Sequence, residues 1–276
     1  MINRLGIENL TLMGMPPIQY VELAAELGCV GVSLGLTSMP FERFGFTNVN
    51  LYPEWSLVDD LKLRREFKAA LADTGIAISL GEGFRADPTL DVSEKAEWLD
   101  ILAELGGQRI NAVSIESDRA RTIDQLGKLA DMTLDRGMQF TVEFAPPNAI
   151  NSLSDAISVA RAIGGGKAKV LIDSMHFYRS GSKTEEITAI DSDLIGYAQL
   201  CDAPWEPVDA KPYLMESTFG RSVPGKGDFP LRDWIASLPE HVHIGIEAPA
   251  LADLLAGLSP GDHAARVVAA ARALGA

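Results

Sequence analysis

The sequence has few cysteines and few histidines, and it has no long apolar run. Its two cysteines, Cys29 and Cys201, both lie in apolar segments. A fold built on disulfides is therefore excluded, and buried free thiols in a reducing compartment are expected. No segment approaches about 18 unbroken apolar residues, and the first residues lack the pattern of a signal peptide. We therefore expect a cytoplasmic protein without a membrane partner.

Basic residues are also in deficit. The chain carries 24 lysines and arginines against 38 acidic residues, a formal net charge of −14. This balance argues against binding of nucleic acid or an anionic membrane through a generally basic surface. A single arginine or lysine in a pocket can still hold an anionic substrate, so we expect a small-molecule partner.

Strand-like apolar runs alternate with amphipathic stretches along the whole chain. The strand-like runs cover residues 4–8, 29–36, 76–81, 110–116, 139–145, 169–173, 195–201 and 242–247. The amphipathic stretches cover residues 17–27, 57–73, 92–105, 119–135, 152–163, 184–194, 229–238 and 250–273. Eight strand–helix pairs in 276 residues predict a (β/α)8 TIM barrel that forms a single domain over residues 1–276.

The junctions between these segments support the barrel. Glycine stands where a helix must stop before the next strand, at Gly28, Gly75, Gly106, Gly137 and Gly164. Pro17 stands in the first turn of the first helix, where its missing N–H costs nothing. The rival fold is a doubly wound open sheet, but no glycine-rich phosphate turn follows the first strand.

Two connections, residues 37–56 and 203–228, are longer than a barrel needs. Both follow strands, so both belong to the face on which barrel active sites are assembled. The first is rich in aromatic residues, namely Phe41, Phe44, Phe46, Tyr52 and Trp55. We expect these loops to form the walls or lid of an enclosed, partly apolar pocket; the alternative is simple elaboration of the surface.

A polar residue ends each of four successive strand-like runs. These residues are Glu143, Asp173, Gln199 and Glu247. A buried carboxylate without a partner costs several kcal/mol, so an ion or a partner is implied. Adjacent strands lie about 4.8 Å apart, so the four side chains can converge on one point.

Three carboxylates and an amide oxygen suit one divalent Mn, Mg or Co ion. Zinc is less favoured, because no cysteine and at most one histidine is at hand. Taken singly, each of the four residues could instead cap a helix or pair with an arginine.

His176 stands three residues after Asp173. This offset places it in the loop that follows the strand, where it would reach the rim of the pocket as a substrate contact or proton shuttle. The alternative is a buried histidine with satisfied hydrogen bonds. His263 falls in the last helix, and we expect it to be solvated.

These segments resemble the xylose-isomerase-like TIM barrels, a broad group of sugar-phosphate isomerases and epimerases that also contains the family 2 AP endonucleases. The residues that carry the resemblance are Glu143, Asp173-x-x-His176, Gln199-x-x-Asp202, Pro224-Gly-Lys-Gly227 and Glu247. The resemblance implies that Glu143, Asp173, Gln199 and Glu247 bind one metal ion. It also implies that the two glutamates flank the substrate as acid/base groups.

Glutamine at position 199 departs from the family, in which most members have histidine. Together with Arg221-x-x-Pro-Gly-Lys-Gly it is similar to the 3-dehydroshikimate dehydratases of this fold. Three functions therefore stay open: an isomerase or epimerase of a sugar-like substrate, a dehydratase using the same metal site, and a non-catalytic ligand-binding barrel. An endonuclease is disfavoured by four histidines and a charge of −14.

The expected chemistry is removal of an α-proton from a polyhydroxylated carbonyl compound through a metal-stabilised enediolate. Glu143 and Glu247 would be the acid/base groups, and His176 a substrate contact or proton donor. Arg221 would bind a substrate carboxylate or hydroxyl, unless it pairs with a surface acid. The alanine-rich last helix could pack on the barrel or on a second copy, so a homo-oligomer is possible.

Overall fold

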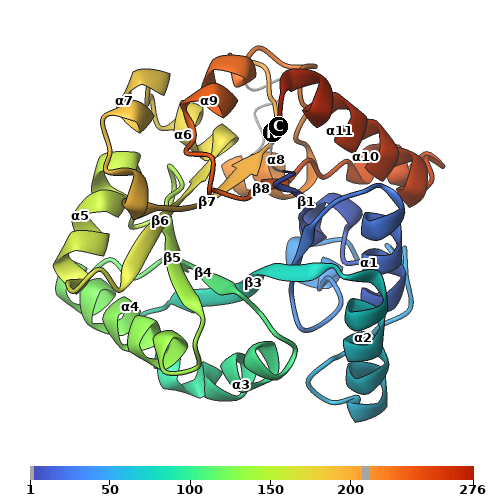
Figure 1. The fold of residues 1–276 in the computed structure, drawn as a ribbon, viewed down its shortest axis with the longest axis horizontal. Coiled ribbons are helices and arrows are strands. Elements are labelled where there is room, and N and C mark those ends of the chain that lie inside the picture. The colour runs from blue at the N-terminus through green and yellow to red at the C-terminus, as the bar shows by residue number, and fades with distance from the viewer. Residues whose placement is uncertain (1–2, 207–211) are drawn as a thin grey trace.

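Eight parallel strands close into a barrel in chain order in a computed structural model that describes residues 3–206 and 212–276. Figure 1 shows the strands arranged as a ring. The strands are β1 (Leu5–Ile7), β2 (Gly31–Leu34), β3 (Ala77–Ala86), β4 (Arg109–Ser114), β5 (Gln139–Glu143), β6 (Ala168–Asp173), β7 (Ile195–Leu200) and β8 (Ile244–Ile246). Strand β1 pairs with both β2 and β8, so the ring has no free edge. The predicted (β/α)8 barrel is confirmed.

Helices surround the strands on the outside of the ring (Figure 1). The longer ones are α1 (Pro17–Glu26), α2 (Leu61–Thr74), α3 (Ala96–Glu104), α4 (Arg119–Leu134), α5 (Leu153–Ile163) and α11 (Pro260–Leu274). The shorter ones are α6 (Ser174–Arg179), α7 (Thr184–Thr188), α8 (Tyr213–Phe219), α9 (Leu231–Ser237) and α10 (Leu251–Leu255). Single 3-10 turns cover η1 (Asn9–Leu12), η2 (Phe41–Phe44), η3 (Val92–Lys95) and η4 (Ser192–Leu194).

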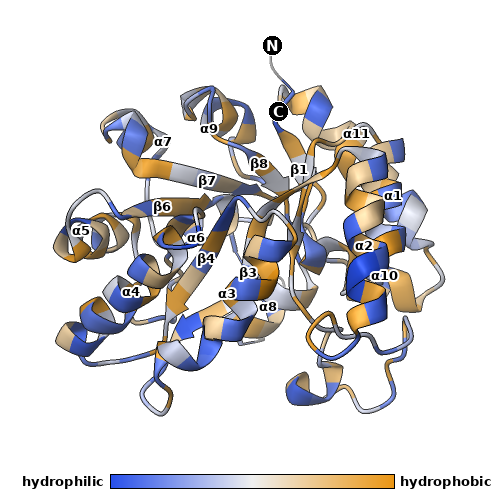
Figure 2. Cartoon of the chain, turned by 60° about the horizontal axis from the view of Figure 1, so that its bottom comes forward, coloured by the Kyte–Doolittle hydropathy of each residue, from blue (hydrophilic) through white to orange (hydrophobic). Residues whose placement is uncertain are grey.

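Helix α2 shows how local sequence sets these elements. The Asp60 side chain accepts hydrogen bonds from the N–H groups of Lys62 and Leu63, which begins the helix. Gly75 ends it at a φ of 72°, in the left-handed region that costs other residues energy. Phe67 is buried toward the barrel, and Figure 2 shows the hydrophilic residues of α2 on its outer side. The other four predicted glycine stops also have positive φ.

Helix boundaries differ from the sequence prediction in the second half of the chain. The stretch 184–194 was expected to be one helix, but it holds only α7 and η4, and α6 begins directly after β6. His176 therefore lies in a helix and not in the predicted loop. The last helix is divided into α10 and α11, because Gly257 adopts a φ of 102° between them. None of the helices in the described residues combines the length and apolar character that a bilayer crossing requires.

His263 is buried, which corrects the expectation that it would be solvated. Its Nε2 donates to the carbonyl of Ala248 at 2.8 Å, and its Nδ1 accepts from Arg266 at 3.1 Å. Burial lowers the pKa of His263, and the positive charge of Arg266 lowers it further, against the hydrogen bond to Ala248, which raises it. Cys29 and Cys201 are buried free thiols, as predicted.

The buried, neutral His263 predicts a specific loss of stability in mild acid. As pH falls below about 6.5, the histidine of the unfolded chain takes up a proton that the folded chain excludes. This histidine should lower the free energy of unfolding by up to about 1.4 kcal/mol per pH unit. His263→Gln keeps an N–H for Ala248 but cannot titrate. Urea unfolding between pH 7.5 and 5 should show a steeper decline in the wild type, and parallel declines would contradict the assignment.

Candidate active site

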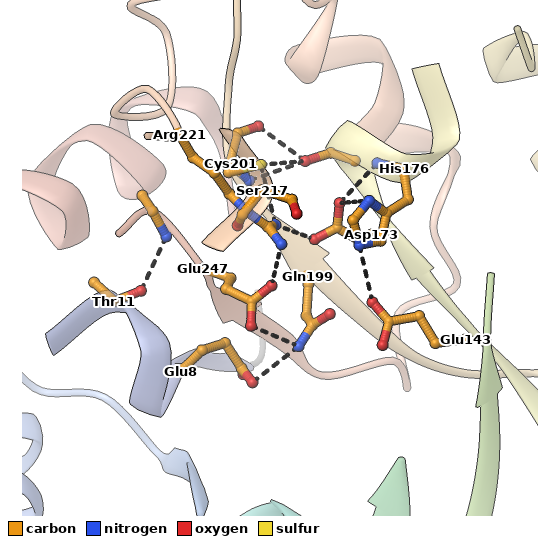
Figure 3. Close-up of polar contacts among 12 residues, drawn as sticks. Glu8, Thr11, Glu143, Asp173, His176, Gln199, Cys201, Ser217, Arg221 and Glu247 are labelled. Atoms are coloured by element: carbon orange, nitrogen blue, oxygen red, sulfur yellow. Dashed lines mark hydrogen bonds and ion pairs between the residues drawn. The ribbon is translucent and has the colours of Figure 1, made fainter. Parts of the chain in front are cut away.

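Four strand ends bring the predicted metal ligands to one end of the barrel. Glu143 is the last residue of β5 and Asp173 the last of β6, while Glu247 follows β8 directly. Asp173 pairs in register with Gln199 of β7, so their side chains project from the same face of the sheet. All four side chains are buried, and Figure 3 shows them around a common space.

A buried guanidinium stands between two of these carboxylates. Arg221 donates through Nη1 to Asp173 and through Nη2 to Glu247, the latter at 2.7 Å (Figure 3). Its Nε is fixed by the Ser217 carbonyl at 2.6 Å. Burial opposes its charge, but Asp173 and Glu247 outweigh burial and raise the pKa of Arg221. The alternative of pairing with a surface acid is therefore wrong, since both partners are buried.

Asp173 also caps the N-terminus of helix α6. Its Oδ1 accepts the backbone N–H of His176 at 2.9 Å, which caps the first turn of α6. Burial opposes its ionisation, yet Arg221 and this cap together leave the pKa of Asp173 lowered. The side chain is thus held as a carboxylate.

His176 reaches back into the site from α6. Its Nδ1 lies 2.6 Å from the Tyr213 hydroxyl, and its Nε2 lies 3.4 Å from Glu143. Burial and the nearby Arg221 bring the pKa of His176 to about 4, against the opposing effect of Asp173. The imidazole is therefore neutral at pH 7 and can donate or accept one hydrogen bond there.

Both predicted acid/base glutamates hold their protons more tightly than a free carboxyl group does. Burial, with Asp173 and Glu143 nearby, raises the pKa of Glu247 well above its usual range, although Arg221 opposes this. Burial and the neighbouring Asp173 raise the pKa of Glu143 to about 7, although Asn111 donates a hydrogen bond to its carboxylate. A carboxyl group in this range can accept and release a proton at neutral pH.

Two further glutamates, Glu8 and Glu82, lie beside Glu247 and were missed in the sequence. A single atom of each of these three carboxylates lies within 4.8 Å of the others. Burial raises the pKa of Glu8, and burial together with Glu8 raises the pKa of Glu82. The rule used for the other strand ends would have found Glu8, because it follows the apolar run of β1.

The Gln199 amide connects the two halves of the site. Its nitrogen lies 3.2 Å from Glu8 and 3.4 Å from Glu247. Its oxygen is buried and has no hydrogen-bond partner among the described residues. In Figure 3 this oxygen points away from Glu8, toward the side on which Glu143 lies. An unpartnered buried acceptor among carboxylates is a suitable ligand for a divalent cation.

The acidic side chains fall into two groups, because the Arg221 guanidinium lies between Asp173 and Glu247. Glu143, Asp173 and His176 form one group with ligand atoms within 4.8 Å of one another. Glu247 belongs to the other, with Glu8 and Glu82. The guanidinium therefore links the two groups through one ion pair to each.

The two long loops, residues 37–56 and 203–228, contact each other. Phe44 and Phe46 pack edge-on against Phe219 of α8, with ring centroids 5.1 and 4.9 Å apart. Trp55 instead joins the main core and donates to the Gly14 carbonyl at 2.9 Å. A cavity of about 740 Å³ is lined by Met13, Gly14 and the loop residues up to Glu54. Part of the second loop, residues 207–211, lies outside the described residues.

Arg221 should contribute more to stability than a surface arginine. Arg221→Met leaves two buried carboxylates facing each other without a cation, which typically costs about 3–5 kcal/mol. Arg136→Met is the matched control, because Arg136 pairs with the exposed Asp100 at 2.7 Å and such pairs contribute about 0–1 kcal/mol. Urea unfolding of the metal-free variants measures both losses. Equal losses would show that Arg221 does not neutralise the site.

The chain matches the family described as "Xylose isomerase-like TIM barrel" over residues 21–259. It is 23% identical over 159 residues to an inosose isomerase of Bacillus velezensis, a match that covers 54% of this chain and 55% of that protein. The chain therefore spans about half the length of this curated relative.

Two solved structures share the whole fold at low identity. A structure of the IolI protein with a bound zinc atom superposes with a TM-score of 0.74 at 16% identity, over 98% of this chain and 96% of that one. The probable 3-DHS dehydratase AsbF of Bacillus anthracis gives a TM-score of 0.69 at 15% identity, over 98% of each chain. At this identity the two structures establish the architecture alone. With the family match over residues 21–259, the chain belongs to the xylose isomerase-like TIM barrel family.

Proposed function

We propose that the protein is a divalent-metal-dependent isomerase or epimerase of a sugar-like polyhydroxy carbonyl compound. The observation that carries this proposal is the convergence of Glu143, Asp173, Gln199 and Glu247, with the Gln199 oxygen left unpartnered among them. These residues fit an oxygen-ligated ion such as Mn, Mg or Co. The isomerase among the relatives supports the reaction class.

A divalent ion bound by these four residues would polarise a substrate carbonyl and stabilise the negative charge that develops on its oxygen. The chain's own residues supply the proton transfers. One of the two glutamates, Glu143 or Glu247, accepts the α-proton, and the other returns a proton to the substrate. The neutral His176 would bind a substrate hydroxyl as a hydrogen-bond donor or acceptor, and its low pKa argues against the predicted role of proton donor.

Arg221 pairs with both Asp173 and Glu247, so it would border a substrate held at these residues. Its planar donors suit a substrate carboxylate or hydroxyl.

A dehydratase acting on a carboxylate-bearing substrate is the second candidate, favoured by the buried Arg221 and by Gln199. Proton removal occurs as in the first candidate, but the enolate then expels a β-hydroxyl group, which leaves as water after protonation. The likeness in fold to a probable 3-DHS dehydratase agrees with this alternative.

Elemental analysis tests the metal site. Purified wild type should contain nearly one equivalent of Mn, Co or Mg, and Glu143→Ala and Glu247→Ala should lose it, since each removes one of four ligands. Lys62→Ala, at an exposed pair with Glu66, should retain the metal and serves as the control. A wild type that neither contains metal nor binds added Mn²⁺ or Co²⁺ would overturn the enzyme proposal and favour a ligand-binding barrel.

Product analysis in heavy water separates the two reactions. We expect an isomer or epimer of a ketose that carries solvent deuterium at the α-carbon, and Glu143→Gln should lower kcat by about 10²–10⁴-fold. If instead 3-dehydroshikimate is converted to a product that has lost water, the dehydratase is correct. Mass spectrometry distinguishes these outcomes in one screen.

A further inference from the structure

The Gln199 amide is held by its nitrogen end alone. Its Nε2 has three acceptors, with Glu8 at 3.2 Å, Glu247 at 3.4 Å and Glu82 at 3.5 Å. Its Oε1 has none among the described residues. The two ends of an amide have nearly the same shape, so hydrogen-bond partners decide which end faces which way. Here the acceptors on the β1 and β3 side decide it.

Glu8 occupies a place built for its carboxylate. Gly245 of β8 pairs in register with both Gly6 of β1 and Gln199 of β7. A Cβ on Gly245 would come within 1.5 Å of Glu8 Oε1, so the carboxylate fills the space of the missing side chain. The same Oε1 accepts a hydrogen bond from the Tyr197 hydroxyl at 2.7 Å. The other oxygen, Oε2, is thereby directed at the Gln199 amide.

We propose that Glu8 is a positioning residue that turns the Gln199 oxygen toward Glu143 and Asp173 and so makes glutamine a competent metal ligand. This inference rests on the metal site of the proposed function. Glutamine can ligate only through its oxygen, so a flipped amide would present N–H groups to the cation. Each such flip would remove one ligand and add an unfavourable dipole.

The same geometry argues against a second cation between Glu8, Glu82 and Glu247, although their oxygens lie close together. The amide nitrogen of Gln199, which carries two N–H donors, lies within 3.5 Å of an oxygen of each of the three carboxylates. The amide therefore already uses part of the hydrogen-bonding capacity of these oxygens. Glu8, Glu82 and Glu247 thus orient the amide of Gln199, and so set the direction in which its oxygen points.

Manganese binding, measured by electron paramagnetic resonance of free Mn²⁺, tests this role without an assay of activity. Glu8→Met has similar length but no carboxylate to accept the amide N–H. We expect it to weaken Mn²⁺ binding by about 10-fold or more, the usual effect of losing the partner that orients a metal ligand. Circular dichroism of each variant checks that the barrel still folds.

The Gln199→Ala background separates orientation from charge. With no amide to orient, Glu8→Met should change the Mn²⁺ affinity by a much smaller factor than it does in the wild type. An equal factor in both backgrounds would mean that Glu8 acts only through its charge, and no effect in the wild type would mean that it does not act at all. Either result overturns the proposal.

Gly245→Ala provides an independent variant. It keeps Glu8, but the added methyl group would occupy the space of the Glu8 carboxylate and force it to move. It should also weaken Mn²⁺ binding, and unchanged binding in a folded variant would contradict the proposal. Failure of the wild type to bind Mn²⁺ would overturn the metal site itself and this inference with it. Wild-type binding without coupling between residues 8 and 199 would overturn the inference alone.

Discussion

An excess of buried negative charge at one end of the barrel is the constraint on which the rest of the site depends. Within residues 3–206 and 212–276, five carboxyl groups gather there, four of them buried and that of Glu82 partly exposed. One guanidinium, that of Arg221, contacts two of them. The carboxyl groups belong to Glu8, Glu82, Glu143, Asp173 and Glu247. Because charge buried in this way is costly, part of it is neutralised by raised pKa values and part by Arg221. What remains is an affinity for a cation.

The closed barrel brings these residues together. Parallel strands all end at the same face, so polar residues at the ends of several strands come close to one another. Register then assigns the neighbours: Asp173 stands beside Gln199, and Gln199 stands beside Gly245. The absence of a side chain on Gly245 leaves room for the carboxylate of Glu8, which follows the neighbouring strand β1. A barrel with a larger residue there would have to place that carboxylate elsewhere.

Much of the fold follows from local sequence. Alternation of apolar runs with amphipathic stretches, together with the glycine stops, predicts the barrel and most of its long helices. The short helices α6 and α8 escape this reasoning, because six or seven residues carry too little periodicity to be told from a loop. The position of His176 was wrong for the same reason.

The sequence predicts a site residue only where the position of that residue at the end of a strand-like run is enough to place it. Strand-end polarity identified Glu143, Asp173, Gln199 and Glu247. The same rule covers Glu8, which follows β1 directly, but the rule was applied only to the last four strands. The pairing of Arg221 with Asp173 joins residues 48 positions apart through a loop. No spacing rule predicts such a contact, since it depends on the path of the chain between them.

The backbone around Glu247 is fastened from both ends of the chain. Thr11 donates to the Ile246 carbonyl at 2.6 Å and accepts from the Ala248 N–H at 2.9 Å, while His263 of α11 holds the Ala248 carbonyl at 2.8 Å. Helix α11 thus helps to fix the backbone next to Glu247, a proposed catalytic residue. Loss of this hydrogen bond would leave the barrel closed but would let Glu247 shift, and so lower the catalytic rate.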